Sequence, residues 1–214
     1  MMKKLIFVTI AAVMLSGCTK ITMNDSYNEN TVEKDMASLV KQGFLTDEDT
    51  VLIKDYVSSW GVSAEDSLSY ESLLSSAKYE KEKEERNKKI QEKLDQAMSV
   101  CFVKKEYLYY RGENSIVFDT KVTNNTEENI CGYSFHADIR NGSGDKLYGA
   151  TWTGTDVVKA NSSIVTKYRF TYDYDDDDID DVKKIEAADL DKLQIEYHIT
   201  AIIYDDGTSL EIEE

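Results

Sequence analysis

The sequence predicts an α+β protein in which a helical N-terminal half is followed by an antiparallel Ig-like β-sandwich. Up to about Met98, apolar residues recur at helical spacing, whereas after Cys101 they alternate with polar residues at period two. Clusters of Asn, Asp and Gly separate the alternating runs, as turns between antiparallel strands do. Several short alternating runs with regularly spaced turns favour a sandwich.

The first residues have the three parts of a secretory signal. A basic start at residues 1–4 is followed by an apolar run from Leu5 to Leu15 and by small residues before Cys18. The apolar run is shorter than the roughly 20 residues that a membrane-spanning helix needs. Leu15-Ser16-Gly17-Cys18 resembles the lipobox of bacterial lipoproteins. The alternative is an ordinary signal peptide with a chance cysteine.

The lipobox resemblance implies a lipid anchor at Cys18. It implies removal of residues 1–17, diacylglycerol on the Cys18 sulfur and acylation of the new amino group. Several acyl chains give durable anchoring, whereas one chain does not. Thr19 follows, where an Asp would suggest retention in the inner membrane. In a Gram-negative host this favours an outer-membrane anchor facing the periplasm.

The negative charge of the chain argues against nucleic acid as a partner. Loss of Lys3 and Lys4 with the signal leaves 23 basic residues of 25 against 41 acidic ones, so the net charge falls from −16 to about −18. A protein of this charge is repelled by phosphate backbones, so nucleic acid is not an expected partner. Binding to anionic lipid headgroups beyond the anchor is disfavoured for the same reason.

Two cysteines remain once Cys18 carries lipid. Cys101 and Cys131 form an even pair in an oxidising compartment, which predicts a disulfide. The alternative is two buried free thiols. Two cysteines alone do not make a metal site, and we expect neither a metal nor a cofactor.

Residues 18–30 are polar and are expected to form a lipidated tether, and residues 31–99 a helical region. Residues 31–42 carry apolar side chains at helical spacing and are followed by Gly43. Thr46 and the acids after it resemble an N-cap with an acidic first turn, and Gly61 is the expected end of that helix. These two short helices should form an antiparallel hairpin.

Ser63 is expected to cap a longer helix that runs to about Met98. Its two ends have apolar faces, but the stretch from Lys81 to Lys89 is wholly polar, with Glu-to-base pairs such as Glu82 and Arg86 four residues apart. This predicts a solvated arm between two packed ends. A coiled coil is the alternative, although no apolar heptad continues through the middle.

Residues 100–214 are expected to form the sandwich. The alternating runs lie at residues 116–122, 131–139, 164–172 and 195–203. Asp206-Gly207 lies between two further apolar stretches and predicts a tight hairpin. The interval from Cys101 to Cys131 is shorter than in antibody domains and Trp152 lies after the pair, so a true antibody-type domain is not supported.

Several motifs together resemble a family of uncharacterised bacterial lipoproteins. They are the lipobox, Phe44-Leu45-Thr46-Asp47-Glu48-Asp49, the Lys/Glu-rich helix from Ser72 to Asp95, Asn124-Asn125-Thr126-Glu127-Glu128-Asn129-Ile130, and Asp189-Leu190-Asp191-Lys192-Leu193. The resemblance implies a helical stalk followed by a β-sandwich and brings no catalytic residues. The chain departs from the family by having no proline.

Few residues suit catalysis. Both histidines, His136 and His198, fall among polar neighbours by strand parity, so we expect them on solvated faces. A Ser/His/Asp site would need one of them beside a serine in space. Neither a Gly-rich phosphate loop nor zinc-type ligand spacing is present.

The acidic run from Asp173 to Asp181 could bind calcium, but it lacks the Gly and Glu positions of an EF-hand. A solvated acidic turn is the alternative, with at most weak binding.

The sequence favours a non-catalytic binding or scaffolding module, anchored by lipid in the cell envelope, with a protein partner of unknown identity. An envelope hydrolase and a protective lipoprotein that neutralises a toxin or inhibitor are the alternatives. Exposed sandwich faces and the acidic run are the candidate contact surfaces.

Replacement of the lipobox cysteine tests the anchor. We expect Cys18→Ser to abolish lipid attachment and to leave unprocessed precursor, because the Cys18 sulfur carries the lipid. Incorporation of labelled palmitate and detergent partitioning are the measurements. A variant that still incorporates lipid would contradict the assignment.

Overall fold

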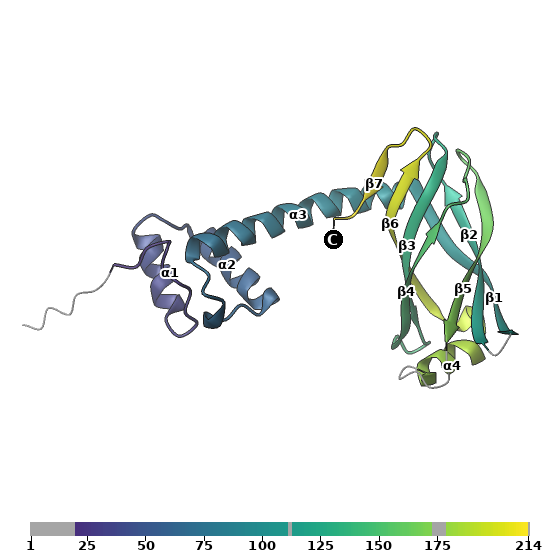
Figure 1. Cartoon of the computed structure of the whole chain (residues 1–214), viewed down its shortest axis with the longest axis horizontal. Coiled ribbons are helices and arrows are strands. Elements are labelled where there is room, and N and C mark those ends of the chain that lie inside the picture. The colour runs from purple at the N-terminus through teal and green to yellow at the C-terminus, as the bar shows by residue number, and fades with distance from the viewer. Residues whose placement is uncertain (1–19, 111–112, 173–178, 214) are drawn as a thin grey trace, which may run out of the picture. The chain divides into compact units, whose positions relative to one another are not determined.

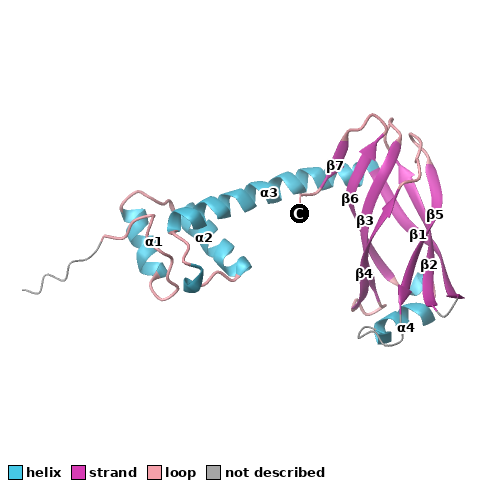
Figure 2. Cartoon of the chain, in the orientation of Figure 1, coloured by secondary structure: helices cyan, strands magenta, loops and turns pink. Residues whose placement is uncertain are grey.

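The computed structural model describes residues 20–110, 113–172 and 179–213. The chain forms two compact units, Met1–Lys81 and Glu82–Glu214. The helices are α1 (Val32–Lys41), α2 (Asp47–Trp60), α3 (Tyr70–Ala97) and α4 (Ile179–Ala187). The strands are β1 (Met98–Tyr110), β2 (Glu113–Asn124), β3 (Ile130–Arg140), β4 (Lys146–Gly154), β5 (Ser163–Tyr172), β6 (Gln194–Tyr204) and β7 (Ser209–Glu211). The predicted α+β class is confirmed (Figures 1 and 2).

The first unit packs α1, α2 and the start of α3 around a small apolar core of Tyr27, Met36, Leu39, Leu45, Ile53, Tyr70 and Leu73. Both predicted short helices are confirmed. Thr46 and Asp49 form a capping box at the start of α2, with each side chain accepting a hydrogen bond from the other residue's backbone N–H. Lys78 lies 2.9 Å from the Asp49 carboxylate, and its hydrogen bond, together with those from the Thr46 N–H and the Thr46 hydroxyl, lowers the pKa of Asp49 to about 2.

Two expectations about this unit are wrong. The described part of the expected tether is packed, since Tyr27 is buried in the core and its N–H donates to the carbonyl of Leu68. Ser63 caps only a 3₁₀ helix, Ala64–Asp66, because Ser67 adopts a left-handed conformation with φ 53° that ends the turn. The long helix begins later, at Tyr70.

Helix α3 has buried side chains only near its two ends, as predicted. Leu73 and Ala77 are buried near its start, and Leu94 and Ala97 near its end. Its polar middle is nevertheless held by the C-terminal segment, because the Asn87 side chain and the Glu213 backbone exchange hydrogen bonds of 2.8 and 3.0 Å. The arm is therefore not simply solvated over its whole length.

The second unit is a two-sheet β-sandwich. One sheet has the strand order β1-β2-β5 and the other β4-β3-β6-β7, and all pairings are antiparallel (Figure 1). Strands β2 and β5 share one sheet while β3 and β6 share the other, which is the Greek-key arrangement of Ig-like sandwiches. The predicted hairpin is confirmed, with Gly207 at φ +88° between β6 and β7. Strands β1 and β4 were not among the predicted runs.

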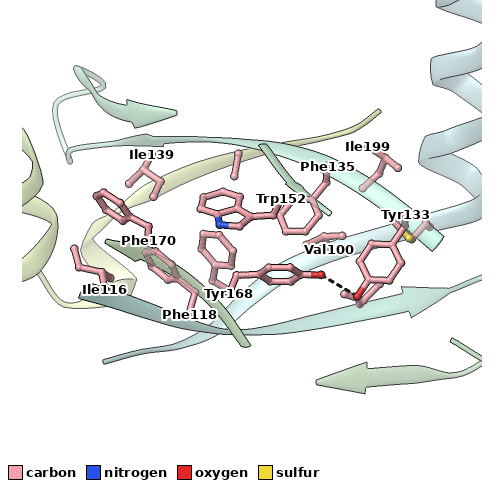
Figure 3. Close-up of a cluster of buried hydrophobic side chains, with 14 of the residues drawn as sticks. Val100, Ile116, Phe118, Tyr133, Phe135, Ile139, Trp152, Tyr168, Phe170 and Ile199 are labelled. Carbon is pink, nitrogen blue, oxygen red and sulfur yellow. Dashed lines mark hydrogen bonds between the residues drawn. The ribbon is translucent and has the colours of Figure 1, made fainter. Parts of the chain in front are cut away.

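Aromatic side chains from both sheets fill the space between them (Figure 3). Phe135 and Trp152 of one sheet pack against Tyr168 of the other, with the Phe135 and Tyr168 ring centroids 5.3 Å apart. The Tyr168 hydroxyl donates a 2.9 Å hydrogen bond to the Tyr133 hydroxyl, and burial raises the pKa of both phenols. This buried bond joins β5 directly to β3 and satisfies both hydroxyls.

Helix α4 packs beside β4 at one end of the sandwich (Figure 1). Val182 and Ile185 insert into the sandwich core. The Lys105 ammonium of β1 donates to carbonyls at the end of α4, those of Ile185, Glu186 and Ala188. A cation at the last carbonyls of a helix compensates its unsatisfied acceptors, so β1 and α4 stabilise each other.

The pair of Gly154 and Tyr133 tests the packing of β3 against β4. A Cβ on Gly154 would lie 2.1 Å from Cζ of the buried Tyr133 ring. We expect Gly154→Ala to lower the free energy of unfolding by at least about 2 kcal/mol, because the ring cannot move without disturbing the core. Denaturant unfolding is the measurement. Gly142→Ala is the control, since its Cβ would meet only the Lys192 carbonyl oxygen, at 3.8 Å. Equal stability of the two variants would contradict this packing.

Candidate functional site

The outer face of the β4-β3-β6 sheet carries a polar cluster whose position follows from the core. In β3, Phe135, Ala137 and Ile139 are buried, so the residues between them point away from the core. His136 and Asp138 therefore lie on the outer face. The prediction that both histidines occupy outward positions among polar neighbours is confirmed.

Strand β6 completes the cluster. Its register places His198 directly opposite His136 and Glu196 directly opposite Asp138. The only two histidines of the sequence are thus cross-strand neighbours, each two residues from a carboxylate on its own strand. We call His136, Asp138, Glu196 and His198 the His/carboxylate cluster.

The ligand atoms of Asp138, Glu196 and His198 are close together, and His136 contacts Asp138. His136 Nε2 lies 3.1 Å from Asp138 Oδ1, and His198 Nε2 lies 3.7 Å from Glu196 Oε1. One side-chain ligand atom each from Asp138, Glu196 and His198 lies within 4.8 Å of the others, the one such metal-competent group in the described part of the chain. The side chain of Asp138 is 16% exposed, whereas Glu196 is 60% exposed and can move.

Two cations and a glycine surround Asp138. Lys146 Nζ lies 2.6 Å from Oδ1 and an Arg140 nitrogen 3.9 Å from Oδ2. The hydrogen bond from Lys146, with smaller contributions from His136, lowers the pKa of Asp138. Gly149 lies opposite Asp138 on β4, and a Cβ there would lie 2.7 Å from Oδ1. The absence of a side chain at Gly149 therefore makes room for the carboxylate and Lys146.

Thr151 of β4 contacts the other nitrogen of His136. Its Oγ1 lies 3.0 Å from Nδ1, and the Nε2 of the same ring contacts Asp138. The Thr151 hydroxyl, the His136 imidazole and the Asp138 carboxylate therefore form a continuous row of contacts. The order resembles a catalytic relay, but acyl transfer also needs N–H donors aimed at an oxyanion. Backbone N–H groups of a strand lie in the plane of the sheet, whereas the Thr151 hydroxyl stands above it. The row therefore orients the imidazole, and the strand backbone directs no N–H group at an oxyanion above the Thr151 hydroxyl.

A second surface lies on the other sheet. The β1 patch consists of Val103, Tyr107, Leu108 and Tyr109, which are 50%, 45%, 37% and 63% exposed. β1 is an edge strand, because among the described strands it pairs with β2 alone. A groove beside the patch is lined by Glu106, Tyr107, Leu108, Val117, Lys167 and Arg169. Leu108 points to the opposite face of the sheet from Tyr107 and Tyr109, so these side chains border the edge on both sides. Exposed apolar side chains at a sheet edge are typical of protein contact sites.

The predicted Cys101–Cys131 disulfide is wrong: both cysteines are free in the structure. Cys101 is exposed between the buried Val100 and Phe102 of β1, so its thiol points outward from one sheet. Cys131 is half-buried on β3 of the other sheet and donates to the Tyr204 carbonyl. Packed sheets lie about 10 Å apart, whereas bridged cysteines need Cα atoms within about 7 Å.

Two further predicted features fall at least partly outside the described residues. Cys18 lies there, as do residues 173–178 of the acidic run. The described remainder of that run, Asp180 and Asp181, forms the first turn of α4, where carboxylates suit the helix dipole. None of the described helices is both long and apolar enough to cross a bilayer.

Comparison with known proteins identifies no family. Neither a family model nor a curated protein matches the sequence. A solved structure described as "X-ray structure of Northeast Structural Genomics Consortium target SoR45" is 14% identical, over 56% of this chain and 85% of that chain, with a TM-score of 0.27. A similarity this low carries no argument about function.

Sequence reasoning placed the two histidines on outer faces but missed their pairing. The signal that could have found it is the spacing His136-x-Asp138 in one strand and Glu196-x-His198 in another. Because side chains alternate between the two faces of a strand, residues two apart lie on the same face, so each spacing places its histidine beside its carboxylate. Only the strand order and register, which no local pattern specifies, bring the two motifs together.

Thiol counting tests the cysteine assignment. We expect Cys101 and Cys131 both to react in denatured, unreduced protein, and Cys101 to react much faster than Cys131 in the native protein because it is exposed. A thiol reagent with mass-spectrometric site assignment provides both measurements, and Cys101→Ser is the control for the fast phase. Absence of free thiols before reduction would contradict the structure.

Proposed function

We propose that this chain is a lipid-anchored lipoprotein of the bacterial cell envelope whose β-sandwich is a non-catalytic module that binds another protein. The lipobox-like segment ending at Cys18 supports the anchor. The observation that carries the binding role is the β1 patch, in which apolar side chains are exposed on an edge strand. Such side chains gain free energy when a partner covers them.

The edge position favours an extended segment of the partner. Among the described strands, β1 has a neighbour on one side only, so N–H and C=O groups along its other side can pair with an added strand. Tyr107, Leu108 and Tyr109 flank that edge and can contact apolar side chains of an added strand. Main-chain bonds would provide affinity and the side chains selectivity.

The charges beside the patch favour an acidic residue in that segment. Lys167 is already shared between Asp119, at 3.3 Å, and Glu106, at 3.7 Å. Arg169 also lines the groove and makes no ion pair within the described residues. A carboxylate of the partner could pair with Arg169, as guanidinium groups bind carboxylates in two-bond geometry.

An envelope hydrolase is the weaker alternative. Its only support is the row formed by Thr151, His136 and Asp138. The nearby cationic donors, Lys146 and Arg140, are paired with Asp138, and the strand backbone directs its N–H groups along the sheet, so no oxyanion hole in the described part of the chain faces the Thr151 hydroxyl. A protective lipoprotein that neutralises a toxin is a particular case of protein binding. Identification of the bound partner distinguishes it from a scaffold.

Site-specific crosslinking in intact cells tests the binding role. We expect a photoreactive amino acid at Tyr109 to give one discrete protein adduct, and the same group at Val165 to give none. Val165 is equally exposed, at 62% against 63%, but belongs to β5 at the other edge of the same sheet. Adding Leu108→Glu should reduce the Tyr109 adduct about tenfold, since it removes an apolar contact and places a carboxylate in the groove that competes with the partner for Arg169.

The outcomes separate the two parts of the proposal. Identical adducts at both positions, or none at either, would exclude the β1 patch as the contact surface. If the Tyr109 adduct forms in the lipid-anchored protein but is lost when Cys18→Ser is added, the anchor is needed for the two proteins to meet. That result leaves the assignment of the surface intact. Thermal unfolding of each variant serves as the folding control.

A further inference from the structure

We infer that the His/carboxylate cluster of His136, Asp138, Glu196 and His198 is a binding site for a divalent transition-metal ion of the Zn²⁺ type. The cluster offers two imidazoles and two carboxylates on one face of two adjacent strands. This inference is independent of the proposed protein-binding role, because the β1 patch lies on the other sheet.

The donor set selects the class of metal. Imidazole nitrogen together with carboxylate oxygen suits Zn²⁺, Cu²⁺ and Ni²⁺, whereas Ca²⁺ and Mg²⁺ prefer oxygen ligands alone. Two carboxylates bring a charge of −2 to the cluster, which a divalent cation neutralises. Asp138, Glu196 and His198 provide three convergent ligands, and His136, in contact with Asp138, is the candidate for the fourth position of a four-coordinate Zn²⁺.

The geometry needs only side-chain movement. The ligand atoms of Asp138, Glu196 and His198, which lie within 4.8 Å of one another, must approach to the roughly 3.4 Å that separates ligands around a tetrahedral ion with bonds of about 2.1 Å. His136 already lies beside this group, with Nε2 3.1 Å from Asp138 Oδ1. The backbone of β3 and β6 already holds the four Cβ atoms in paired register. His198 and Glu196 are exposed enough to rotate, with side chains 46% and 60% accessible.

Thr151 is placed to orient the His136 ring for metal binding. Its hydroxyl, 3.0 Å from His136 Nδ1, can accept that nitrogen's proton in a hydrogen bond. The resulting tautomer leaves the lone pair of Nε2 facing Asp138 and the rest of the cluster. Metal-binding histidines commonly have their second nitrogen fixed in this way.

Lys146 forms an ion pair with the carboxylate of Asp138. Its ammonium lies 2.6 Å from Asp138 Oδ1, where it neutralises the charge that a metal would take. The Lys146 side chain is 50% exposed, so an arriving metal can displace it into solvent. The lysine therefore competes with the metal, and its removal should strengthen binding.

Calorimetric titration of Zn²⁺ into the full-length, detergent-purified protein tests the site. A Cys101→Ser, Cys131→Ser background and millimolar Ca²⁺ remove thiol sites and carboxylate-only sites from the measurement. We expect one Zn²⁺ per chain, with a dissociation constant in the micromolar range. His136→Gln and His198→Gln should each weaken binding at least about tenfold, and Lys146→Met should tighten it several-fold.

A neighbouring residue on the same face provides the matched control. Gln194 lies on β6 opposite Arg140, two residues beyond Glu196, so Gln194→Ala should leave Zn²⁺ affinity unchanged. Thermal unfolding checks that each variant is folded, and Glu196→Gln replaces any histidine variant that is not. Co²⁺ gives a second readout, because nitrogen and oxygen ligands in tetrahedral geometry produce intense visible absorption that His198→Gln should abolish.

Three results would overturn the inference. They are Zn²⁺ affinity unaffected by either histidine substitution, binding abolished equally by Gln194→Ala, and the absence of saturable binding below millimolar Zn²⁺. Tighter binding in Lys146→Met with loss in His198→Gln would support it, because a purely electrostatic surface would not require the imidazole.

Discussion

Burial of aromatic side chains between the two sheets is the constraint on which the rest of the second unit depends. Tyr133 and Phe135 of β3 must point inward to meet Tyr168 of β5, through a 2.9 Å hydrogen bond and an edge-on ring contact. A slip of one residue in β3 would turn these rings to solvent and bury His136 and Asp138. The core therefore holds the polar cluster on the outer face, although no cluster side chain contributes to the core.

The two candidate surfaces belong to opposite sheets and arise from different physical causes. The His/carboxylate cluster lies on paired strands, where register sets the positions of its side chains. The β1 patch lies on an edge strand, next to a bulge between Phe102 and Lys104. There the Phe102 N–H donates to the Tyr197 hydroxyl of the other sheet at 2.7 Å, while Val103 is exposed. The patch and the cluster can therefore be occupied at the same time.

Local patterns predicted the parts of the fold in which one residue type repeats regularly. Alternation in β2, β3, β5 and β6 identified these strands, and Thr46 with Asp49 identified the start of α2. Strand β1 was missed because Lys104 and Lys105 interrupt its apolar run, although Lys105 is used to cap α4. Strand β4 was missed because Gly149 and Gly154 weaken its pattern, and both glycines make room for side chains of β3.

The sequence by itself determined the placement of α1, α2 and α3 before the strands, the outward direction of His136 and His198, and the lipobox-like start, because each depends on residues close together in the chain. Tertiary structure alone decided which outward residues meet. It separated Cys101 from Cys131 on two sheets and brought His136 beside His198 on one. The physical reason is that alternation along a strand specifies the face of each side chain, whereas strand order and register are set by the packing of the whole core.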